Sequence, residues 1–325
     1  MYLDSTKGIG IFLVIFAHNT SFLVDYIYSF HMPLFFILSG VLHSNSDNKT
    51  FVLKKFKSLL VPYFSFASIL YVIWYFFSRN FGRMAANNTS PLKAFIGIFL
   101  GQTNISSIEW GISLWFLPCL FIVSFLFNNI IKLNKIYAIF LSISLGFIGW
   151  KMSNSLHIEI PWNFYTALVA LPFYSFGYYF KDLFINHKYS LKVRELFFLI
   201  FLLIINLLTF KINGKTNMLN NLYQNIFLFY ICAISGSLFL LLGFKSLDLK
   251  SKFLIFLGQN TLILLSFHII AKSFIKIVYI LLKIPFIENN FVYAFVYALI
   301  EILICLPLIL MYNKFTQVSL KRYSF

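Results

Sequence analysis

Charged residues are scarce in this chain of 325 residues, and their scarcity excludes several classes of protein. Only 11% of the residues are charged, whereas a soluble domain usually carries about a quarter. The three cysteines all lie within apolar runs, so neither a disulfide framework nor a zinc site is indicated. The composition therefore argues against a soluble two-domain protein, a disordered chain, a collagen-like fibre and a disulfide scaffold.

Apolar residues dominate instead, at 60% of the chain with a mean hydropathy of +0.84. A helix needs about 20 mainly apolar residues to cross a bilayer. Such runs predict ten spans, near residues 8–24, 29–44, 59–77, 113–131, 136–152, 163–180, 196–212, 222–243, 253–271 and 291–312. The shorter stretch 92–101 is predicted to be an interfacial or re-entrant part of the connection 78–112. We expect one all-α integral membrane domain over 1–325, with no appended soluble domain and no cleaved signal peptide.

The distribution of basic residues predicts the orientation, because lysine and arginine are retained on the cytoplasmic side. With the amino terminus inside, 17 of the 26 basic residues fall in cytoplasmic segments and 9 in outer segments. This split predicts that both termini are cytoplasmic. It also explains much of the formal charge of +16 without nucleic acid, so we expect contact with membrane lipid and none with nucleic acid.

One face of the first predicted span carries ionisable residues, which are costly inside a membrane and are therefore functional candidates. Lys7 and His18 are eleven positions apart, which places them about 20° apart around a helix and about 16 Å apart along it. Asp4 precedes Lys7 by three residues and lies near the same stripe. The simpler interpretation makes Lys7 a membrane anchor and His18 a structural residue that is hydrogen-bonded to a neighbouring helix.

Four further residues are expected at the depth of His18 on this topology. His31 opens the second span, Glu109 and Trp115 stand at the outer entrance to the fourth, and His268 lies about fifteen residues into the ninth. Each residue alone is more often structural than functional. Their common level nevertheless predicts a polar site in the outer half of the bundle.

Other charged residues have plainer interpretations. Glu301 in the tenth span is expected to accept a hydrogen bond from a neighbouring Ser, Tyr or Lys, and Lys272 and Lys276 are expected to reach the outer interface. Lys54, Lys55 and Lys57 either stop the span on the cytoplasmic side or bind phosphate groups. No nucleotide-binding loop, zinc-protease motif, metal-ligand cluster or serine-hydrolase elbow is present, so no metal is expected. Catalysis by a histidine base fits best.

The sequence resembles the membrane acyltransferase 3 family, in the segments LDSTKGIGIFLVIFAHN and FHMPLFFILSG. Within that family it resembles the branch of fucose 4-O-acetylase-like and enterobacterial-common-antigen O-acetyltransferase-like proteins. The blocks LWFLPCLF, PYF at 62–64 and GQNTLILLSFH support the likeness, which spans essentially the whole chain. The family's first span usually carries an arginine, ten residues and a histidine. Lys7 takes the arginine position before His18. A lysine keeps the positive charge but lacks the planar guanidinium group that binds a phosphate through two parallel hydrogen bonds.

The resemblance implies a ten-helix enzyme that takes an acyl group, usually acetyl, from acyl-CoA on the cytoplasmic side. The acceptor is a sugar hydroxyl of a surface polysaccharide or its lipid-linked precursor, at the outer face of a bacterial inner membrane. Acetyl-CoA is then a substrate, and no tightly bound cofactor is expected. Some members carry an additional carboxy-terminal hydrolase-like domain, which is not expected in this chain.

These expectations combine into a mechanistic hypothesis. His18 is the predicted base, and Lys7, Lys54, Lys55 and Lys57 are expected to face the CoA phosphates. Glu109 or His31 is expected to orient the imidazole or hold the sugar, and Trp115 to stack on the pyranose ring. Both direct attack by the hydroxyl and an acyl-histidine intermediate remain open. The alternatives are a polysaccharide flippase or other transporter, a glycan polymerase, and a purely structural membrane protein. The sequence shows no two-fold internal similarity of the kind that transporters often have.

Overall fold

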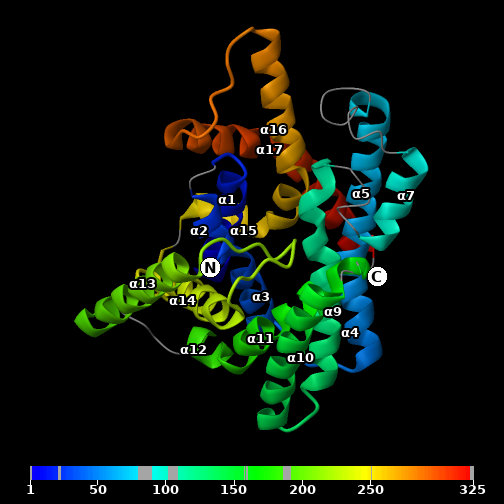
Figure 1. Cartoon of the computed structure of the whole chain (residues 1–325). Helices are drawn as coiled ribbons and strands as arrows, with labels where there is room; N and C mark the ends of the chain where they lie inside the picture. The colour runs from blue at the N-terminus through cyan, green and yellow to red at the C-terminus, as the bar shows by residue number, and fades with distance from the viewer. Residues whose placement is uncertain are drawn as a thin grey trace. The chain divides into compact units, whose positions relative to one another are not determined.

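The computed structural model describes residues 2–20, 23–79, 90–101, 109–156, 158, 160–185, 192–249 and 251–322. Within these ranges the chain is helical, and the only paired extended residues are Asn217 and Leu222. Figure 1 shows the helices in chain order. Two compact units are present, one formed by residues 28–248 and one by residues 1–27 together with 249–325. The prediction of an all-α membrane protein is confirmed.

The first unit consists of residues 1–27 and 249–325. These two segments flank the second unit, residues 28–248, in the sequence. Its elements are α1 (Tyr2–Ala17), nearly all of α2 (Val24–Tyr28), α15 (Lys252–Gln259), α16 (Thr261–Leu281) and α17 (Phe291–Arg322). Helix α1 packs along α15 and also contacts α16 and α17. Helix α1 therefore packs against three helices from the other end of the chain.

The second unit contains the remaining helices. They are α3 (His31–Val41), α4 (Asn48–Lys55), α5 (Val61–Ile73), α7 (Pro91–Leu100), α9 (Phe116–Ile130), α10 (Lys135–Ser155), α11 (Phe164–Tyr179), α12 (Lys181–Ile185), α13 (Val193–Asn213) and α14 (Ile226–Ser246). Two π-helical turns, Phe56–Leu60 and Trp74–Ser78, extend α4 and α5 into one long segment. Two 3-10 helices, Glu109–Trp115 and Pro161–Asn163, precede α9 and α11. The most extensive packing in this unit joins α10 to α11, α13 to α14, and α3 to α11.

Each of the ten predicted spans overlaps a helix, and within the described ranges eight segments are long and apolar enough to cross a membrane. These eight are Val24–Val41, Asn48–Phe77, Gly111–Ile130, Lys135–Ser155, Val193–Asn213, Ile226–Ser246, Thr261–Leu281 and Phe291–Lys314. Helices α1 and α11 have only 16 residues each, or about 24 Å, against a hydrocarbon thickness of about 30 Å. The short apolar helix predicted at 92–101 is present as α7.

The ninth predicted span, 253–271, is wrong in its bounds because the helix breaks at Asn260. The backbone of Asn260 leaves the helical region, at φ −112° and ψ 20°, and separates α15 from α16. Its side-chain amide donates to the Phe256 carbonyl at 2.8 Å, and its Oδ1 accepts from Asn313 of α17 at 3.0 Å. A short polar side chain that bonds to the backbone competes with the helix in this way. His268 is consequently the eighth residue of α16, so its predicted depth, counted from residue 253, does not hold.

Glycines set the closest helix contacts in both units. A Cβ atom added to Gly8 of α1 would lie 1.9 Å from the Leu254 carbonyl oxygen of α15, and one added to Gly258 would lie 1.9 Å from the Asp4 carbonyl oxygen. In the second unit, Gly40 of α3 faces α11 in the same manner. Small residues let membrane helices approach to backbone contact, where van der Waals packing stabilises them.

Candidate functional site

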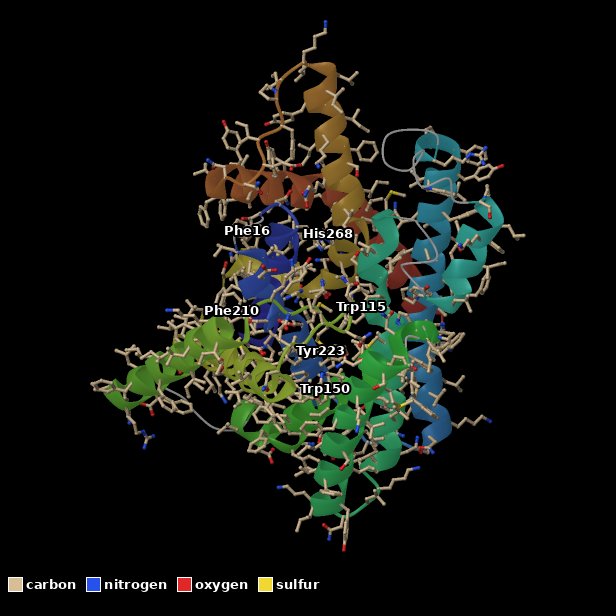
Figure 2. The ribbon with its side chains drawn as sticks, viewed as in Figure 1. Phe16, Trp115, Trp150, Phe210, Tyr223 and His268 are labelled. Atoms are coloured by element: carbon tan, nitrogen blue, oxygen red, sulfur yellow. The ribbon has the colours of Figure 1, made fainter. Side chains whose placement is uncertain are left out.

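His18 follows directly after the last residue of α1 and keeps its helical register. Its backbone amide donates to the Val14 carbonyl at 3.2 Å, which continues the hydrogen-bond pattern of the helix by one residue. The spacing between Lys7 and His18 is therefore that of one helix, as the sequence predicts. Phe16, labelled in Figure 2, marks this end of α1.

A second histidine lies against the first. The ring centroids of His18 and His268 are 5.0 Å apart, with the rings tilted by 48°. His268 lies on α16, is fully buried and is labelled in Figure 2. Two of the three histidines that were predicted to meet are thus adjacent within one unit.

The hydrogen bonds of His268 fix the position of its proton. Its Nδ1 lies 2.9 Å from the Leu264 carbonyl oxygen and 3.0 Å from that of Leu265. Carbonyl oxygens only accept hydrogen bonds, so Nδ1 carries the hydrogen and, in the neutral ring, Nε2 presents a lone pair. Among the described residues this buried Nε2 has no hydrogen-bond partner. His268 can therefore accept a hydrogen bond or a proton at Nε2.

Lys272, one turn further along α16, points toward the same place. Its ammonium group donates a hydrogen bond to the backbone carbonyl of His18, and its charge acts on both His268 and Glu301. The Lys272 side chain reaches an orphan carbonyl at the end of α1, and its predicted position at the outer interface stays a prediction. Lys276 instead pairs with Glu288 at 2.9 Å, and both side chains are well exposed.

Glu301 of α17 also lies in the group of side chains around His18, because it is hydrogen-bonded to Asn19, the residue after His18. The Asn19 Nδ2 atom donates to Glu301 Oε1 at 2.8 Å and to the Ile15 carbonyl at 3.0 Å. The sequence predicted a Ser, Tyr or Lys partner for Glu301, and that prediction is wrong, because the turn after α1 brings an asparagine within reach. Glu301 is fully buried and Asn19 is 8% exposed.

Four buried polar atoms in this group lack hydrogen-bond partners within the described part of the chain. They are His268 Nε2, Glu301 Oε2, Asn19 Oδ1 and Thr20 Oγ1. An unsatisfied buried polar atom costs about 1–3 kcal/mol, so a concentration of such atoms in a native fold calls for an explanation. Together with the histidine pair and the Lys272 ammonium, they form a polar site that can move a proton and hold a polar ligand.

The other predicted residues of the first unit lie near the opposite end of α1. Asp4 and Lys7 form an ion pair at 3.5 Å, and both side chains are partly exposed. The predicted charge pair is therefore present. Its part in binding an acyl donor stays a prediction.

Three predicted residues belong to the second unit. His31 is buried at the start of α3, with its ring 5.0 Å from that of Tyr28. Trp115, labelled in Figure 2, is buried at the end of a 3-10 helix and packs edge-on against Phe116 at 6.2 Å. Glu109 begins the same helix, and its side chain lies outside the described part of the structure. The predicted meeting of these residues with His18 stays a prediction.

The lysine cluster of the second unit is mainly solvent-accessible. Lys54 and Lys57 are exposed, whereas Lys55 is half-buried with its Nζ 5.6 Å from the centre of the Phe51 ring. Such accessibility suits either of the two interpretations, a positive-inside anchor or a phosphate contact.

Sequence reasoning missed His43, which lies two residues beyond the span Val24–Val41. Its Nδ1 is 2.9 Å from the Tyr174 hydroxyl, and its ring packs 4.9 Å from that of Phe51 and 5.4 Å from that of Phe127. A single histidine in a polar loop gives no sequence signal of this aromatic surrounding.

We expect His43 to make the protein less stable in acid. Burial, and after it the charges of Lys55 and Lys181, lower the pKa of His43 from 6.5 to about 4. The unfolded chain therefore binds a proton that the folded chain does not, so stability is complete above pH 6.5 and is lost as the pH falls toward 4, by up to about 3 kcal/mol. Unfolding of the detergent-solubilised protein at several pH values checks this. His43→Phe cannot titrate, so the free energy of unfolding of this variant should depend less steeply on pH between 6.5 and 4. An equally steep pH dependence in the variant contradicts the prediction.

The fold and the site define a multi-span membrane protein with a polar histidine site inside a helical unit. A family model described as an acyltransferase domain matches residues 2–310. The chain therefore belongs to the membrane acyltransferase 3 family. Neither the curated proteins nor the solved structures that were compared with the chain match it significantly.

Proposed function

We propose that this membrane acyltransferase is an O-acetyltransferase of the branch that its sequence resembles. It would move acetyl from cytoplasmic acetyl-CoA to a sugar hydroxyl of a surface polysaccharide or its lipid-linked precursor, at the outer face of a bacterial inner membrane. The observation that carries the proposal is the pair of His18 and His268, 5.0 Å apart, beside the Lys272 ammonium in a chain of an acyltransferase family. Family membership favours acyl transfer over the flippase and polymerase alternatives.

The chemistry requires a base, because a hydroxyl is a poor nucleophile at neutral pH. In the direct mechanism, His18 takes the hydroxyl proton while the oxygen attacks the thioester carbonyl carbon. The tetrahedral adduct then collapses, the carbon–sulfur bond breaks, and the leaving CoA thiolate takes the proton back from the imidazolium. In the alternative, a His18 ring nitrogen attacks the thioester carbon, the carbon–sulfur bond breaks, and the CoA thiolate takes the imidazole proton. The acceptor oxygen then attacks the acetyl-histidine, the carbon–nitrogen bond breaks, and the released imidazole takes the hydroxyl proton.

The Lys272 ammonium suits this step for an electrostatic reason. Its hydrogen bond to the His18 carbonyl holds a positive charge near the reacting imidazole, and a fixed charge in a water-poor site stabilises a developing oxyanion more strongly than it would in water. Lys7 in the first unit and Lys54, Lys55 and Lys57 in the second stay the predicted contacts of the CoA phosphates.

The proposal is tested by NMR of the surface polysaccharide from cells with the intact gene, with a deletion, and with the deletion complemented. We expect the O-acetyl signals to disappear on deletion and to return on complementation. A flippase or polymerase would change the amount or chain length of the glycan and leave its acyl content per sugar unchanged. Persistence of every O-acetyl signal in the deletion strain would contradict the proposal. Labelled acetyl-CoA supplied to inside-out membrane vesicles then tests the donor.

A further inference from the structure

Three of the four unpartnered atoms around Glu301 are hydrogen-bond acceptors, and the fourth, the Thr20 hydroxyl, can accept or donate. The Asn19 amide is oriented by its two acceptors, the Ile15 carbonyl and Glu301 Oε1. Both of its N–H groups are therefore used, and the remaining atom is Oδ1. A flipped amide would place oxygen against oxygen, which the geometry excludes. Asn19 therefore offers only a hydrogen-bond acceptor to a further group.

The neighbouring groups offer acceptors as well. Glu301 Oε1 is taken by Asn19, and its Oε2, buried and without a partner among the described residues, accepts hydrogen bonds when the group is a carboxylate. His268 Nε2 presents a lone pair because its Nδ1 faces two carbonyl oxygens. Three side chains that are each at least nine-tenths buried thus each present a free acceptor atom, beside the Lys272 ammonium, which is a donor.

These acceptors belong to one site. Asn19 is bonded to Glu301 at 2.8 Å and follows His18 in the chain, and His18 packs against His268 at 5.0 Å between ring centres. Covalent geometry then keeps the free oxygens of Asn19 and Glu301 within a few ångströms of each other. These acceptor atoms are complementary to a ligand group that donates hydrogen bonds, such as a hydroxyl.

We infer that Asn19 and Glu301 form a hydroxyl-binding subsite for the sugar acceptor, which holds a hydroxyl next to the one that reacts at the histidine pair. This inference rests on the proposed function and deepens it by naming a substrate feature. The acceptor must carry at least two neighbouring free hydroxyls, one that is acylated and one that donates to the Asn19–Glu301 pair. A hydroxyl bound there would supply the hydrogen-bond donor that Asn19 Oδ1 and Glu301 Oε2 lack among the described residues.

The test replaces one acceptor atom of the subsite by a donor. Glu301→Gln keeps the shape and an oxygen for Asn19 but replaces the other carboxylate oxygen by an NH2 group, which cannot accept from a hydroxyl. Initial rates are measured with labelled acetyl-CoA and, as acceptor, the membrane fraction of the gene-deleted strain. We expect the KM for the acceptor to rise about two- to tenfold, as for loss of one hydrogen bond, with the KM for acetyl-CoA unchanged.

Glu288→Gln is the matched control, because it makes the same change at an exposed carboxylate of the same unit, paired with Lys276. Both variants should unfold at the same temperature and differ only in the KM for the acceptor. An acceptor KM for Glu301→Gln equal to that of the control, or an equal rise in both KM values, overturns the inference. If Glu301→Gln does not accumulate, Asn19→Ala must raise the acceptor KM in the same selective manner.

The outcomes separate the inference from the proposed function. A wild-type protein that transfers no acetyl group in this assay contradicts the proposed function and, with it, the acceptor subsite. An active wild type whose Glu301→Gln variant keeps a normal acceptor KM contradicts the subsite alone.

Discussion

Replacing His18 with alanine should lower kcat for acetyl transfer by about 10²- to 10⁴-fold, the usual contribution of a general base. The physical reason is that the acceptor hydroxyl then keeps its proton and attacks the thioester only weakly. The KM for acetyl-CoA should change little, since the substitution removes a group that acts in the transition state. Initial rates with labelled acetyl-CoA and membranes of the gene-deleted strain measure both constants.

A matched control for this loss is His43→Ala, which removes a buried histidine from the second unit. This variant should lose stability and keep its kcat. Rapid quenching of the wild type, followed by a search for acetyl on the protein, separates direct attack from an acyl-histidine intermediate. Transfer by His18→Ala within about threefold of the wild-type rate would show that His18 is not the base.

A methyl group added to Gly40 should destabilise the second unit strongly. The Cβ atom of Gly40→Ala would lie 2.0 Å from the Tyr174 carbonyl oxygen, and that of Gly177→Ala 2.0 Å from the Ile37 carbonyl oxygen. Because the obstructing atoms belong to the backbone, α3 and α11 must move apart along their contact. We expect a loss of about 3 kcal/mol or more, at or above the upper end for overpacked cores. Thermal unfolding in detergent micelles measures the loss.

Gly243→Ala is the control for the glycine effect itself. Gly243 also lies in a helix of the second unit, α14, and an added Cβ atom would have no neighbour within 4 Å. Alanine has the higher helix propensity, so this variant should gain about 0.5–1 kcal/mol. Equal effects of the Gly40 and Gly243 substitutions would show that close packing does not require glycine at position 40.

The helices could be predicted from the sequence because a lipid environment leaves few alternatives for long apolar runs. Their exact bounds could not. Apolar residues flank the short polar segment at 259–261 on both sides, and Asn260 ends α15 by bonding to the backbone of its own helix and to Asn313. Whether a polar residue ends a helix depends on partners that no local pattern reveals.

The candidate site was predicted in part. His18 and His268 could be selected because histidines are costly in a membrane, and their rings do meet. The roles of Lys272 and Glu301 were missed, since each interacts with the turn after α1, more than 250 positions away in the sequence. Helical periodicity gives the face on which a residue lies, but it does not tell which helix packs against that face.

The pairing of α1 with α15, α16 and α17 has a consequence for biosynthesis. Membrane helices enter the bilayer in the order of translation, and amino-terminal segments usually fold first. The polar end of α1 must instead wait while all of residues 28–248 are synthesised and inserted. His18 gains His268 and Lys272 as neighbours only after α16 emerges, and Asn19 gains Glu301 only after α17 emerges. A ribosome that stops before residue 301 therefore leaves a polar helix end exposed in the membrane, a feature that quality-control proteases can recognise.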